Sequence, residues 1–383
     1  MKTILVLGAG QGGIVTAREL SRHSGNEEDI NLVKILVFEK EETNVYSPSL
    51  PWVMVGKSKQ EEITERIHRL DASGLEVIKG EIENIDPKNI AVTVKGKQYK
   101  GDHMVVSLGV AQTDAFDLRK YGFNFFTLKG AQDFYTQLKK FAGGEIAILV
   151  SSLPFKSPAA PYEAAMLIED YVGKNNLLKN TTVSLYTPEA GPMEFAGAEA
   201  SQELRELLEK KGIKYYPNYE LKIVSGNSLE FSNGEIYSYD LLAYTPKHLL
   251  PEVIKTSDLA GKSGWVDVDN KTLETKFSNV YAIGDITHVT AKNGSVLPKI
   301  GVFARQQAAV VAHNIDRKLA NQKPDQTFVP EGKYFIEVGK GKASETGGRF
   351  SVTGKNDVKM KTPAQWGHFS KWWDEKSWFF KNF

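Results

Sequence analysis

Three glycines near the start of the chain have the spacing of a turn that binds a dinucleotide. Gly8, Gly10 and Gly13 form G-x-G-x-x-G directly after the apolar run 3–7, and residues 14–20 continue with helical spacing. The first glycine makes the tight turn, the second lets the backbone approach a pyrophosphate, and the third lets the helix pack closely on the strand. The helix N-terminus then faces the phosphate charge. This pattern predicts a nucleotide site.

A carboxylate stands where the ribose of such a nucleotide is expected. The second apolar run, 33–38, is predicted to form a strand that ends at Glu39, where an acidic side chain can bind a ribose 2′-hydroxyl. Lys40 follows it, and Gly109 ends a further predicted strand, 104–108, that returns to the same sheet. We expect both residues to border the nucleotide.

A later buried strand lacks the glycine turn of the first. Residues 145–150 are predicted to form this strand, but Pro154, Pro158 and Pro161 follow it and the connection contains no glycine. Proline lacks the N–H group that a pyrophosphate-binding turn supplies. Short strands and helices over 182–245 complete a second Rossmann-like α/β unit, in which strong NADH binding is not expected.

The composition excludes several classes of chemistry. The 383 residues carry 48 Lys and Arg against 47 Asp and Glu, so no excess charge indicates a nucleic-acid partner. There is no cysteine, which excludes disulfides, thiolate metal sites, thiol nucleophiles and redox dithiols. The seven histidines are scattered, so no metal site is expected. No signal-peptide pattern or run of about 18 apolar residues occurs, and a cytoplasmic location is expected.

A later segment resembles a second signature of flavoproteins that have two dinucleotide-binding domains. The predicted strand 279–283 leads into Gly284 and Asp285, and the resemblance implies that Asp285 binds the ribityl chain of FAD. The segment Pro298-Lys299-Ile300-Gly301 then precedes a predicted helix, 302–319. Such a helix directs its positive N-terminal end at the flavin and favours negative charge on the reduced ring.

Seven motifs, in order along the chain, together resemble one family. They are GAGQGG, Glu39, YSPSLPW, PAAPYEAAM, NVYAIGD, PKIG and FIEVGKGKA. With them the chain resembles the sulfide:quinone oxidoreductases and the flavoprotein subunit of flavocytochrome c sulfide dehydrogenase. The resemblance implies an α/β fold with two Rossmann-like dinucleotide-binding domains and a C-terminal amphipathic segment that attaches to a membrane. The implied ranges are 1–112 with 262–325 for the FAD-binding domain, 113–261 for the second domain and 326–383 for the C-terminal region.

The same resemblance implies a non-covalently bound FAD, since a thioether link to the flavin needs a cysteine. The residues expected to hold the FAD are Gly8, Gly10, Gly13, Glu39, Lys40, Ser47, Pro48, Gly109, Gly284, Asp285, Lys299 and Gly301. Tyr46, Pro48 and Trp52 of the YSPSLPW segment either contact the isoalloxazine ring or serve only as packing.

The chain departs from this family at the catalytic thiols. Enzymes of the family use cysteines beside the flavin to receive and lengthen a sulfur chain, and these positions fall here at Ser157, at about Tyr334 and near Phe126. A serine hydroxyl cannot cycle through a persulfide or a disulfide, so weak or absent sulfide turnover is expected. Because every cysteine is missing rather than one, a natural cysteine-free relative is favoured over an engineered inactive enzyme.

Two charged residues join Ser157 and Tyr334 as catalytic candidates, each with a plainer alternative. Glu163 lies near the start of a predicted helix, where an acid complements the helix dipole; alternatively it relays protons to a quinone. Lys299 is either a solvated loop lysine or, beside the flavin, a cation that stabilises the anionic reduced ring.

The C-terminal tail is rich in aromatic residues. Trp366, Phe369, Trp373 and Phe380 share one helical face. Polar positions in the tail are supplied by Lys371, Asp374, Glu375, Lys376 and Lys381. Such a segment is too polar to span a bilayer but suits the interface plane, so peripheral attachment on the cytoplasmic side of a membrane is expected. The alternative is that the aromatic face packs on the second domain or on a twin subunit of a homodimer.

Three functions remain open on the sequence. The first is an FAD-dependent oxidoreductase that passes electrons from a small reductant to a quinone at a membrane surface. The second is a type II NADH:quinone oxidoreductase, which needs the nicotinamide site that the proline-rich connection disfavours. The third is a flavoprotein that serves as a redox sensor or a scaffold.

Overall fold

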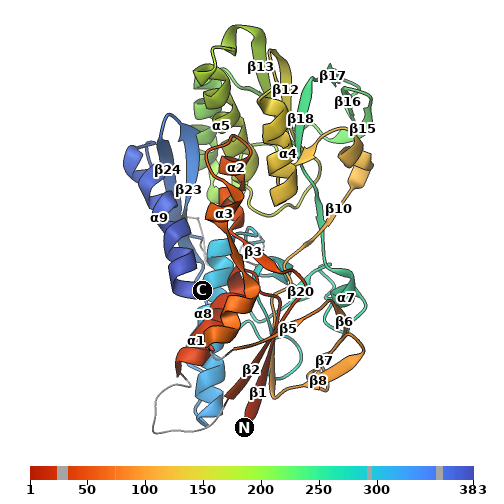
Figure 1. Ribbon diagram of the computed structural model, residues 1–383, viewed down its shortest axis with the longest axis vertical. Helices are drawn as coiled ribbons and strands as arrows, with labels where there is room; N and C mark the ends of the chain where they lie inside the picture. The colour runs from red at the N-terminus through yellow and green to blue at the C-terminus, as the bar shows by residue number, and fades with distance from the viewer. Residues whose placement is uncertain (24–32, 74, 291–295, 351–356) are drawn as a thin grey trace.

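The computed structural model describes residues 1–23, 33–73, 75–290, 296–350 and 357–383 (Figure 1). In these residues one five-stranded parallel sheet has the order β21-β9-β1-β2-β5. Its strands are β1 (Lys2–Leu7), β2 (Val33–Glu39), β5 (Glu76–Lys79), β9 (His103–Val106) and β21 (Val280–Ala282). The strands are nearly continuous apolar runs because both faces of the sheet are covered.

Alternate residues of β1 pack on opposite faces of this sheet. Ile4 and Val6 join the apolar cluster beneath α1 (Gln11–His23) and α8 (Gly301–Leu319). Leu5 and Leu7 join the cluster on the other face, where β6 (Ile82–Asp86), β7 (Ala91–Val94) and β8 (Lys97–Lys100) form an antiparallel sheet. The strand order reverses at β1, which places a ligand-binding crevice at the carboxyl ends of β1 and β9.

A second five-stranded parallel sheet has the order β11-β18-β12-β13-β14. Its strands are β11 (Phe123–Asn124), β12 (Gly144–Val150), β13 (Thr181–Tyr186), β14 (Lys214–Tyr216) and β18 (Leu241–Thr245). One face carries α4 (Leu128–Leu138), α5 (Ala160–Lys174) and α6 (Ala198–Lys210), and the other carries β15 (Leu221–Ser225), β16 (Ser228–Phe231) and β17 (Ile236–Ser238). This is the second Rossmann-like unit that the sequence predicts.

The two halves are joined by β10 (Ala111–Thr113) and β19 (Lys247–Leu249), which pair antiparallel. Past β19, Leu250, Ile254 and Leu259 pack with Leu5 and Leu7 of the first sheet. The sequence predicts that the chain returns to the first half at residue 262. In the structure it returns earlier, because these apolar side chains cover the open face of the first sheet.

The C-terminal region forms an antiparallel layer of its own. β23 (Glu331–Gly339), β24 (Lys342–Arg349) and β25 (Asp357–Met360) pair in that order. The helix α9 (Gln365–Asn382) packs across β24 and β23 at the edge of the molecule (Figure 1). β23 also lies along α5, and the Arg18 guanidinium of α1 donates to the Asn382 carbonyl oxygen at 2.7 Å. This layer therefore contacts both halves.

Short elements complete the described chain. They are β3 (Thr43–Val45), β4 (Thr64–Arg66), α2 (Leu50–Val53), α3 (Gln60–Ile63), α7 (Glu252–Lys255), β20 (Val266–Asp267), β22 (Thr287–His288) and 3-10 turns at Ser47–Ser49, Ile67–Ser73, Ala115–Lys120, Leu178–Asn180, Glu194–Ala196 and Gly284–Ile286.

Candidate functional site

The turn between β1 and α1 leaves room at one of its three predicted glycines. Gly8 has φ +96°, and a Cβ there would lie 2.6 Å from the Ser107 carbonyl oxygen. A Cβ on Gly13 would lie 1.8 Å from the Gly8 carbonyl oxygen, which is closer than atoms can approach. A Cβ on Gly10 would meet no described atom within 4 Å. Gly8 and Gly13 therefore fix the turn, while Gly10 faces open space.

That open space is a cavity of about 920 Å³ beside the glycine turn. The residues of its wall that were predicted to hold the cofactor are Gly8, Gly10, Glu39, Lys40, Ser47, Pro48, Gly109, Gly284, Asp285 and Gly301. Gln11 and Gly301, the first residues of α1 and α8, also border it, so the positive ends of two helices suit an anionic cofactor. The open space at Gly10 and this wall fit an extended nucleotide cofactor such as FAD.

The Glu39 carboxylate is fixed by three backbone N–H groups. Its Oε2 accepts from the N–H of Ala9 at 2.8 Å, and its Oε1 accepts from the N–H groups of Lys40 and Glu41 at 2.8 and 3.0 Å. The end of β2 is thereby tied to the glycine turn. Each carboxylate oxygen has more than one lone pair, so the fixed group can still accept from ribose hydroxyls.

Lys299 does not border the large cavity, although it was predicted to hold the cofactor. Its Nζ donates to the Asp285 carbonyl oxygen at 2.5 Å and to the Thr287 carbonyl oxygen at 3.3 Å, and it stands 3.5 Å from the centre of the Trp265 ring. Burial lowers the pKa of Lys299 to about 8, against the opposing effect of Asp285. A buried ammonium needs acceptors, and here it finds them in the backbone of the turn that carries Asp285. Lys299 thus positions that turn.

Lys156, which sequence reasoning missed, borders both the large cavity and a smaller one beside it. Burial raises the pKa of Asp285, while the charges of Lys156 and Lys299 oppose that rise. No spacing signal marks Lys156, because a single lysine in a proline-rich connection reads as a surface residue. The contact that places the connection is the hydrogen bond from the Ser157 N–H to the Lys299 carbonyl oxygen, 2.8 Å long.

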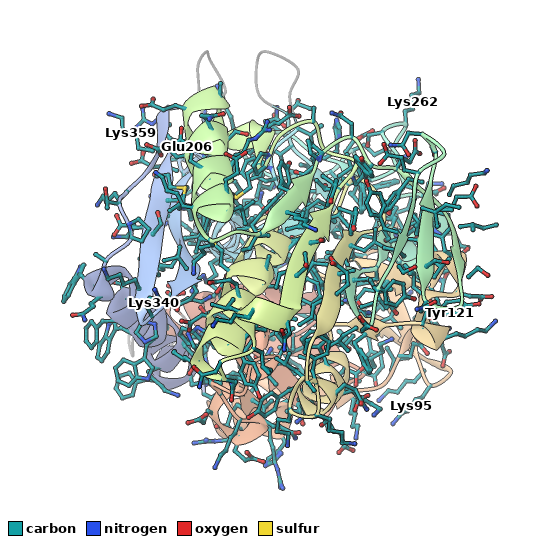
Figure 2. All side chains as sticks on the ribbon, turned by 90° about the horizontal axis from the view of Figure 1, so that it is seen from above. Lys95, Tyr121, Glu206, Lys262, Lys340 and Lys359 are labelled. Carbon is teal, nitrogen blue, oxygen red and sulfur yellow. The ribbon has the colours of Figure 1, made fainter. Side chains whose placement is uncertain are left out.

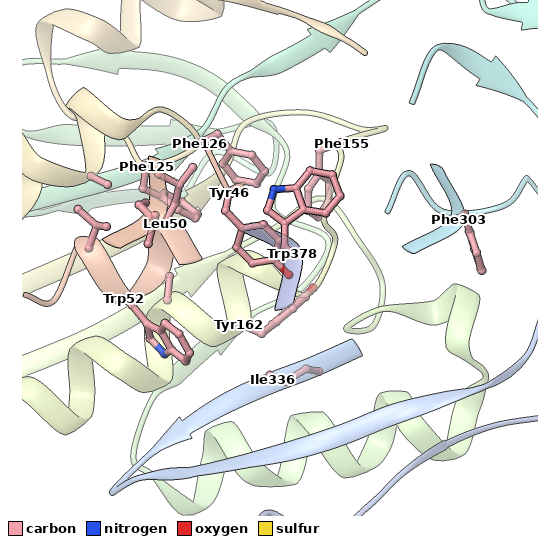
Figure 3. Packing of buried hydrophobic residues seen from close by; sticks show 14 of the residues in the cluster. Tyr46, Leu50, Trp52, Phe125, Phe126, Phe155, Tyr162, Phe303, Ile336 and Trp378 are labelled. Carbon is pink, nitrogen blue, oxygen red and sulfur yellow. The ribbon is translucent and has the colours of Figure 1, made fainter. Parts of the chain in front are cut away.

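The three positions expected to carry thiols come together in the structure. Ser157, Phe126 and Tyr334 all border the smaller cavity, which has a volume of about 120 Å³ and mostly apolar walls. Phe126 packs on Phe125 with ring centres 4.9 Å apart, and Figure 3 shows both rings beside Leu50 and Tyr46. The Tyr334 hydroxyl is buried and has no hydrogen-bond partner among the described residues. Burial also raises the pKa of Tyr334, so this hydroxyl stays neutral and is free to donate a hydrogen bond to a ligand in the cavity.

A buried ion pair borders the same cavity. Glu163, in the first turn of α5, binds the ammonium group of Lys371 from α9, and both side chains are less than one-tenth exposed. Burial raises the pKa of Glu163 to about 7, although Lys371 opposes the rise. The Lys371 Nζ also lies 4.9 Å from the centre of the Trp52 ring. Glu163 can therefore gain and lose a proton near neutral pH at the cavity wall.

The inner face of α9 is polar, which the sequence pattern did not predict. Asp374 accepts from the Tyr46 hydroxyl at 2.5 Å and pairs with the Arg305 guanidinium of α8 at 3.2 Å. Glu375 accepts from the Ser49 hydroxyl at 2.5 Å. Lys371 and Glu375, which were expected to be polar positions of an interfacial helix, are instead buried against α5 and residues 46–52. Glu163 on α5 compensates the charge of Lys371, and the adjacent Lys376 pairs with Glu375 at 2.7 Å, which makes this burial possible.

The outer face of α9 carries most of its aromatic residues, whereas Trp378 is buried against Tyr46 with ring centres 6.0 Å apart. Trp366 is 70% exposed, Trp373 58% and Phe380 90%, and Phe369 and Trp372 are also exposed. Figure 2 shows large rings projecting outward from this helix, away from the rest of the molecule. On the inner side, a Cβ on Gly367 would lie 2.2 Å from the Ala343 carbonyl oxygen, so the helix rests directly on β24. None of the described helices is long and apolar enough to cross a membrane.

The second sheet also has an acid after its second strand. In a Rossmann unit, the acid after the second strand binds the ribose, and here Glu189 follows β13. Its carboxylate accepts from the Tyr162 hydroxyl at 2.5 Å and from the Thr187 hydroxyl at 3.0 Å. Burial raises the pKa of Glu189 to about 7. The acid is therefore bound internally, next to a connection that has prolines in place of glycines.

Several known proteins are similar to this chain in sequence or in structure. The family model described as pyridine nucleotide-disulphide oxidoreductase matches residues 2–312. The mitochondrial sulfide:quinone oxidoreductase of Mus musculus is 26% identical over 347 residues, which cover 85% of this chain and 73% of that protein. The crystal structure of the sulfide:quinone oxidoreductase from the hyperthermophilic bacterium Aquifex aeolicus has a TM-score of 0.88 at 22% identity, and the match covers 100% of this chain and 91% of that one.

A more distant solved structure shares the same fold. NDH2 from Plasmodium falciparum has a TM-score of 0.74 at 12% identity, and the match covers 100% of this chain and 99% of that one. At these identities, both structures show only that the fold is shared. They confirm the expected α/β fold of two Rossmann-like domains.

The similar proteins also confirm the expected relationship to sulfide:quinone oxidoreductases. As the sequence shows, this chain has no cysteine. They confirm the expected class of enzyme, an FAD-dependent oxidoreductase. With most of its length matched by one family model, the chain belongs to the pyridine nucleotide-disulphide oxidoreductase family.

Proposed function

We propose that this chain passes electrons from a small reductant, through non-covalently bound FAD, to a quinone at a membrane surface. The observation that carries the proposal is the mostly apolar cavity that adjoins the cofactor cavity. The Glu163–Lys371 pair lines it, and α9, whose outer face is aromatic, borders it. An apolar chamber with a few polar groups suits a quinone ring.

The cofactor would be held by the glycine turn, by Glu39 and by the Gly284–Asp285 turn. Bound FAD would supply two-electron redox chemistry in the large cavity. The chain itself supplies Lys156 and the N-terminus of α8 there, and both favour negative charge. Without cysteine, the flavin has no thioether link, so denaturation should release it completely.

At the quinone end, two groups have distinct roles. The Tyr334 hydroxyl stays protonated and has no partner among the described residues, so it can donate a hydrogen bond to a carbonyl oxygen. Glu163, with a pKa near 7, can hand a proton to a quinone oxygen and recover it from solvent. Lys371 keeps the ionised form of Glu163 tolerable in this buried place.

The donor is expected to be neither NADH nor sulfide. The connection after β12 contains prolines where a pyrophosphate-binding turn has glycines, so a nicotinamide cofactor lacks the backbone N–H groups that would bind its phosphates. Ser157, Phe126 and Tyr334 cannot accept sulfur. In anaerobic mixing, we expect NADH and sulfide each to leave the flavin absorbance unchanged for many seconds, whereas photoreduced protein should be reoxidised rapidly by a short-chain ubiquinone.

The outcome separates the functions that the sequence left open. Fast bleaching by NADH would favour a type II NADH:quinone oxidoreductase. Rapid quinone reduction with sulfide would show that the missing thiols are not needed. A reduced flavin that no quinone reoxidises would refute the proposal and leave a redox sensor or scaffold.

Membrane attachment is proposed to depend on the exposed face of α9. Deleting the tail is a poor test because Lys371 and Glu375 are buried in the fold. Changing Trp366, Phe369, Trp373 and Phe380 together to serine alters only exposed side chains. We expect binding to vesicles of phosphatidylcholine and phosphatidylglycerol to fall by more than about tenfold in a sedimentation assay, since aromatic rings supply the interfacial affinity.

A matched control is available on the far half of the molecule. Ile223 and Ile236 of β15 and β17 are 51% and 63% exposed, and their change to serine should leave vesicle binding intact. If the aromatic variant instead converts a dimer to a monomer in analytical ultracentrifugation while vesicle binding was never present, the face is a subunit interface.

A further inference from the structure

A second set of buried charges lies directly behind the Glu163–Lys371 pair. Glu337 of β23 is fully buried, and its Oε1 lies 2.7 Å from Nδ1 of His368 on α9. The backbone N–H of Glu337 donates to the Glu163 carboxylate. The His368 side chain is 38% exposed. Besides burial, the charge of Glu337 raises the pKa of Glu163, so the two carboxylates are neighbours, and the Glu337 carboxylate is bonded in turn to a side chain that reaches solvent.

The other charged groups that face Glu337 come from two further segments. Lys57, which follows α2, has its Nζ 3.8 Å from Glu337 Oε2 and 3.8 Å from Asp170 Oδ2 of α5. Asp170 also accepts from Lys174 at 2.8 Å and from the Lys340 N–H at 3.0 Å. Burial lowers the pKa of Lys57, while Glu337 and Asp170 oppose that effect. The carboxylates of Glu163, Glu337 and Asp170 are thus matched by the ammonium groups of Lys371, Lys57 and Lys174.

A purely structural role does not account for Glu337. A fully buried carboxylate is costly, and well-packed apolar residues often replace buried ion pairs without loss of stability. Its Oε2 makes no hydrogen bond within the described part of the chain, so half of the group lacks the contacts that a structural carboxylate normally has. His368 also packs edge-on against Trp52, with ring centres 5.8 Å apart, and Trp52 lies beside Lys371 as well. The ring of Trp52 therefore keeps both ends of this arrangement in place.

We propose that Glu337 and His368 carry protons from solvent to the Glu163–Lys371 pair. The proposal rests on the quinone reduction proposed above. Reducing a quinone to a quinol adds two electrons, which the reduced flavin supplies, and two protons, one to each carbonyl oxygen. Each proton that Glu163 gives up is replaced through His368 and Glu337, which are positioning and relay residues because neither lines the described cavities.

The test compares two electron acceptors in the holoenzyme. Photoreduced protein is mixed in a stopped-flow instrument either with short-chain ubiquinone, which needs protons, or with ferricyanide, which takes electrons alone. In His368→Gln and Glu337→Gln, reoxidation by ubiquinone is expected to slow by about tenfold or more. Reoxidation by ferricyanide is expected to match that of the unmodified chain. A pH-indicator dye in weak buffer should show proton uptake slowed to the same extent, and added imidazole should restore it in His368→Gln.

The control is a histidine–carboxylate pair of equal geometry elsewhere. His313 of α8 lies 2.7 Å from Asp325, and His313→Gln should behave like the unmodified chain with both acceptors. Equal slowing with both acceptors would assign Glu337 and His368 a structural role and overturn the proposal. Normal ubiquinone reoxidation and proton uptake in both variants would overturn the proton path alone. If the unmodified chain reacts with ferricyanide but not with ubiquinone, the proposed function fails first.

Discussion

A Gly10→Ala variant is expected to fold normally and to lose most of its FAD. A Cβ at this position meets no described atom within 4 Å of the protein, so the fold has room for a methyl group. The backbone of the second glycine is where a pyrophosphate approaches closely, and the methyl group would occupy that space. We expect the dissociation constant for FAD, measured by fluorescence titration of the apoprotein, to rise by about tenfold or more, which corresponds to roughly 1.4 kcal/mol.

The neighbouring glycine should behave differently. A Cβ on Gly13 would lie 1.8 Å from the Gly8 carbonyl oxygen, so Gly13→Ala should force α1 away from β1 and lower the melting temperature even without FAD. Gly173 of α5 provides a control, because a Cβ there would meet only the Leu178 side chain, at 3.3 Å. Equal FAD affinity in Gly10→Ala and the unmodified chain would show that the cofactor does not lie against this turn.

Removing the ammonium of Lys371 is expected to destabilise the protein most strongly at alkaline pH. Lys371→Met leaves the Glu163 carboxylate buried without its partner, a change that typically costs about 3–5 kcal/mol. At pH 8.5 this cost should appear in full as a lower urea midpoint of the holoenzyme. At pH 5.5 Glu163 can take up a proton, and much of the loss should be recovered.

The sign follows from the direction of the pKa shift. Burial raises the pKa of Glu163 from 4.5 to about 7 in the folded chain, so the folded state binds the proton more tightly than the unfolded state. The contribution of this group to stability therefore falls as pH rises from about 4.5 to 7, by about 3 kcal/mol, and is constant above that range. Lys371→Met should extend this fall to higher pH, and Glu163→Gln should abolish it.

A second glutamate of α5, which also pairs with a lysine from another part of the chain, serves as the control. Lys211 binds Glu169 of α5 at 2.5 Å, and both side chains are partly exposed. Because water screens this pair, Lys211→Met should cost about 1 kcal/mol or less, with little dependence on pH between 5.5 and 8.5. If Lys371→Met is no more destabilising than Lys211→Met at pH 8.5, the Glu163–Lys371 pair is solvated in solution.

The local sequence was sufficient to predict many of the residues that border the large cavity. Gly8, Gly10 and Glu39 lie within one strand–turn–helix–strand unit, so their spacing already places them at one edge of a sheet. The Gly284–Asp285 turn is also local, since it directly follows a buried strand. The cavity that these residues border therefore follows from short-range patterns that any parallel sheet of this order brings together.

The positions of the charged residues around the smaller cavity depend on long-range packing. Lys371, Arg305 and Lys156 carry no motif, and each acquires its place only when α9, α8 and the connection after β12 meet around one cavity. Lys299, which does lie in a motif, directs its charge to the Asp285 carbonyl oxygen, because a buried ammonium binds the nearest acceptor.

The C-terminal helix α9 shows most clearly what the sequence determines and what the tertiary structure determines. The sequence by itself determined that Trp366, Phe369, Trp373 and Phe380 share one face of a helix, because helical periodicity fixes side-chain direction. Only the tertiary structure decided that the opposite face, with Lys371 and Glu375, would be the buried one. Hydrophobicity alone would bury the aromatic residues, but Glu163 and Ser49 offer Lys371 and Glu375 buried partners. Such partners, hundreds of residues away in sequence, exist only once the chain has folded.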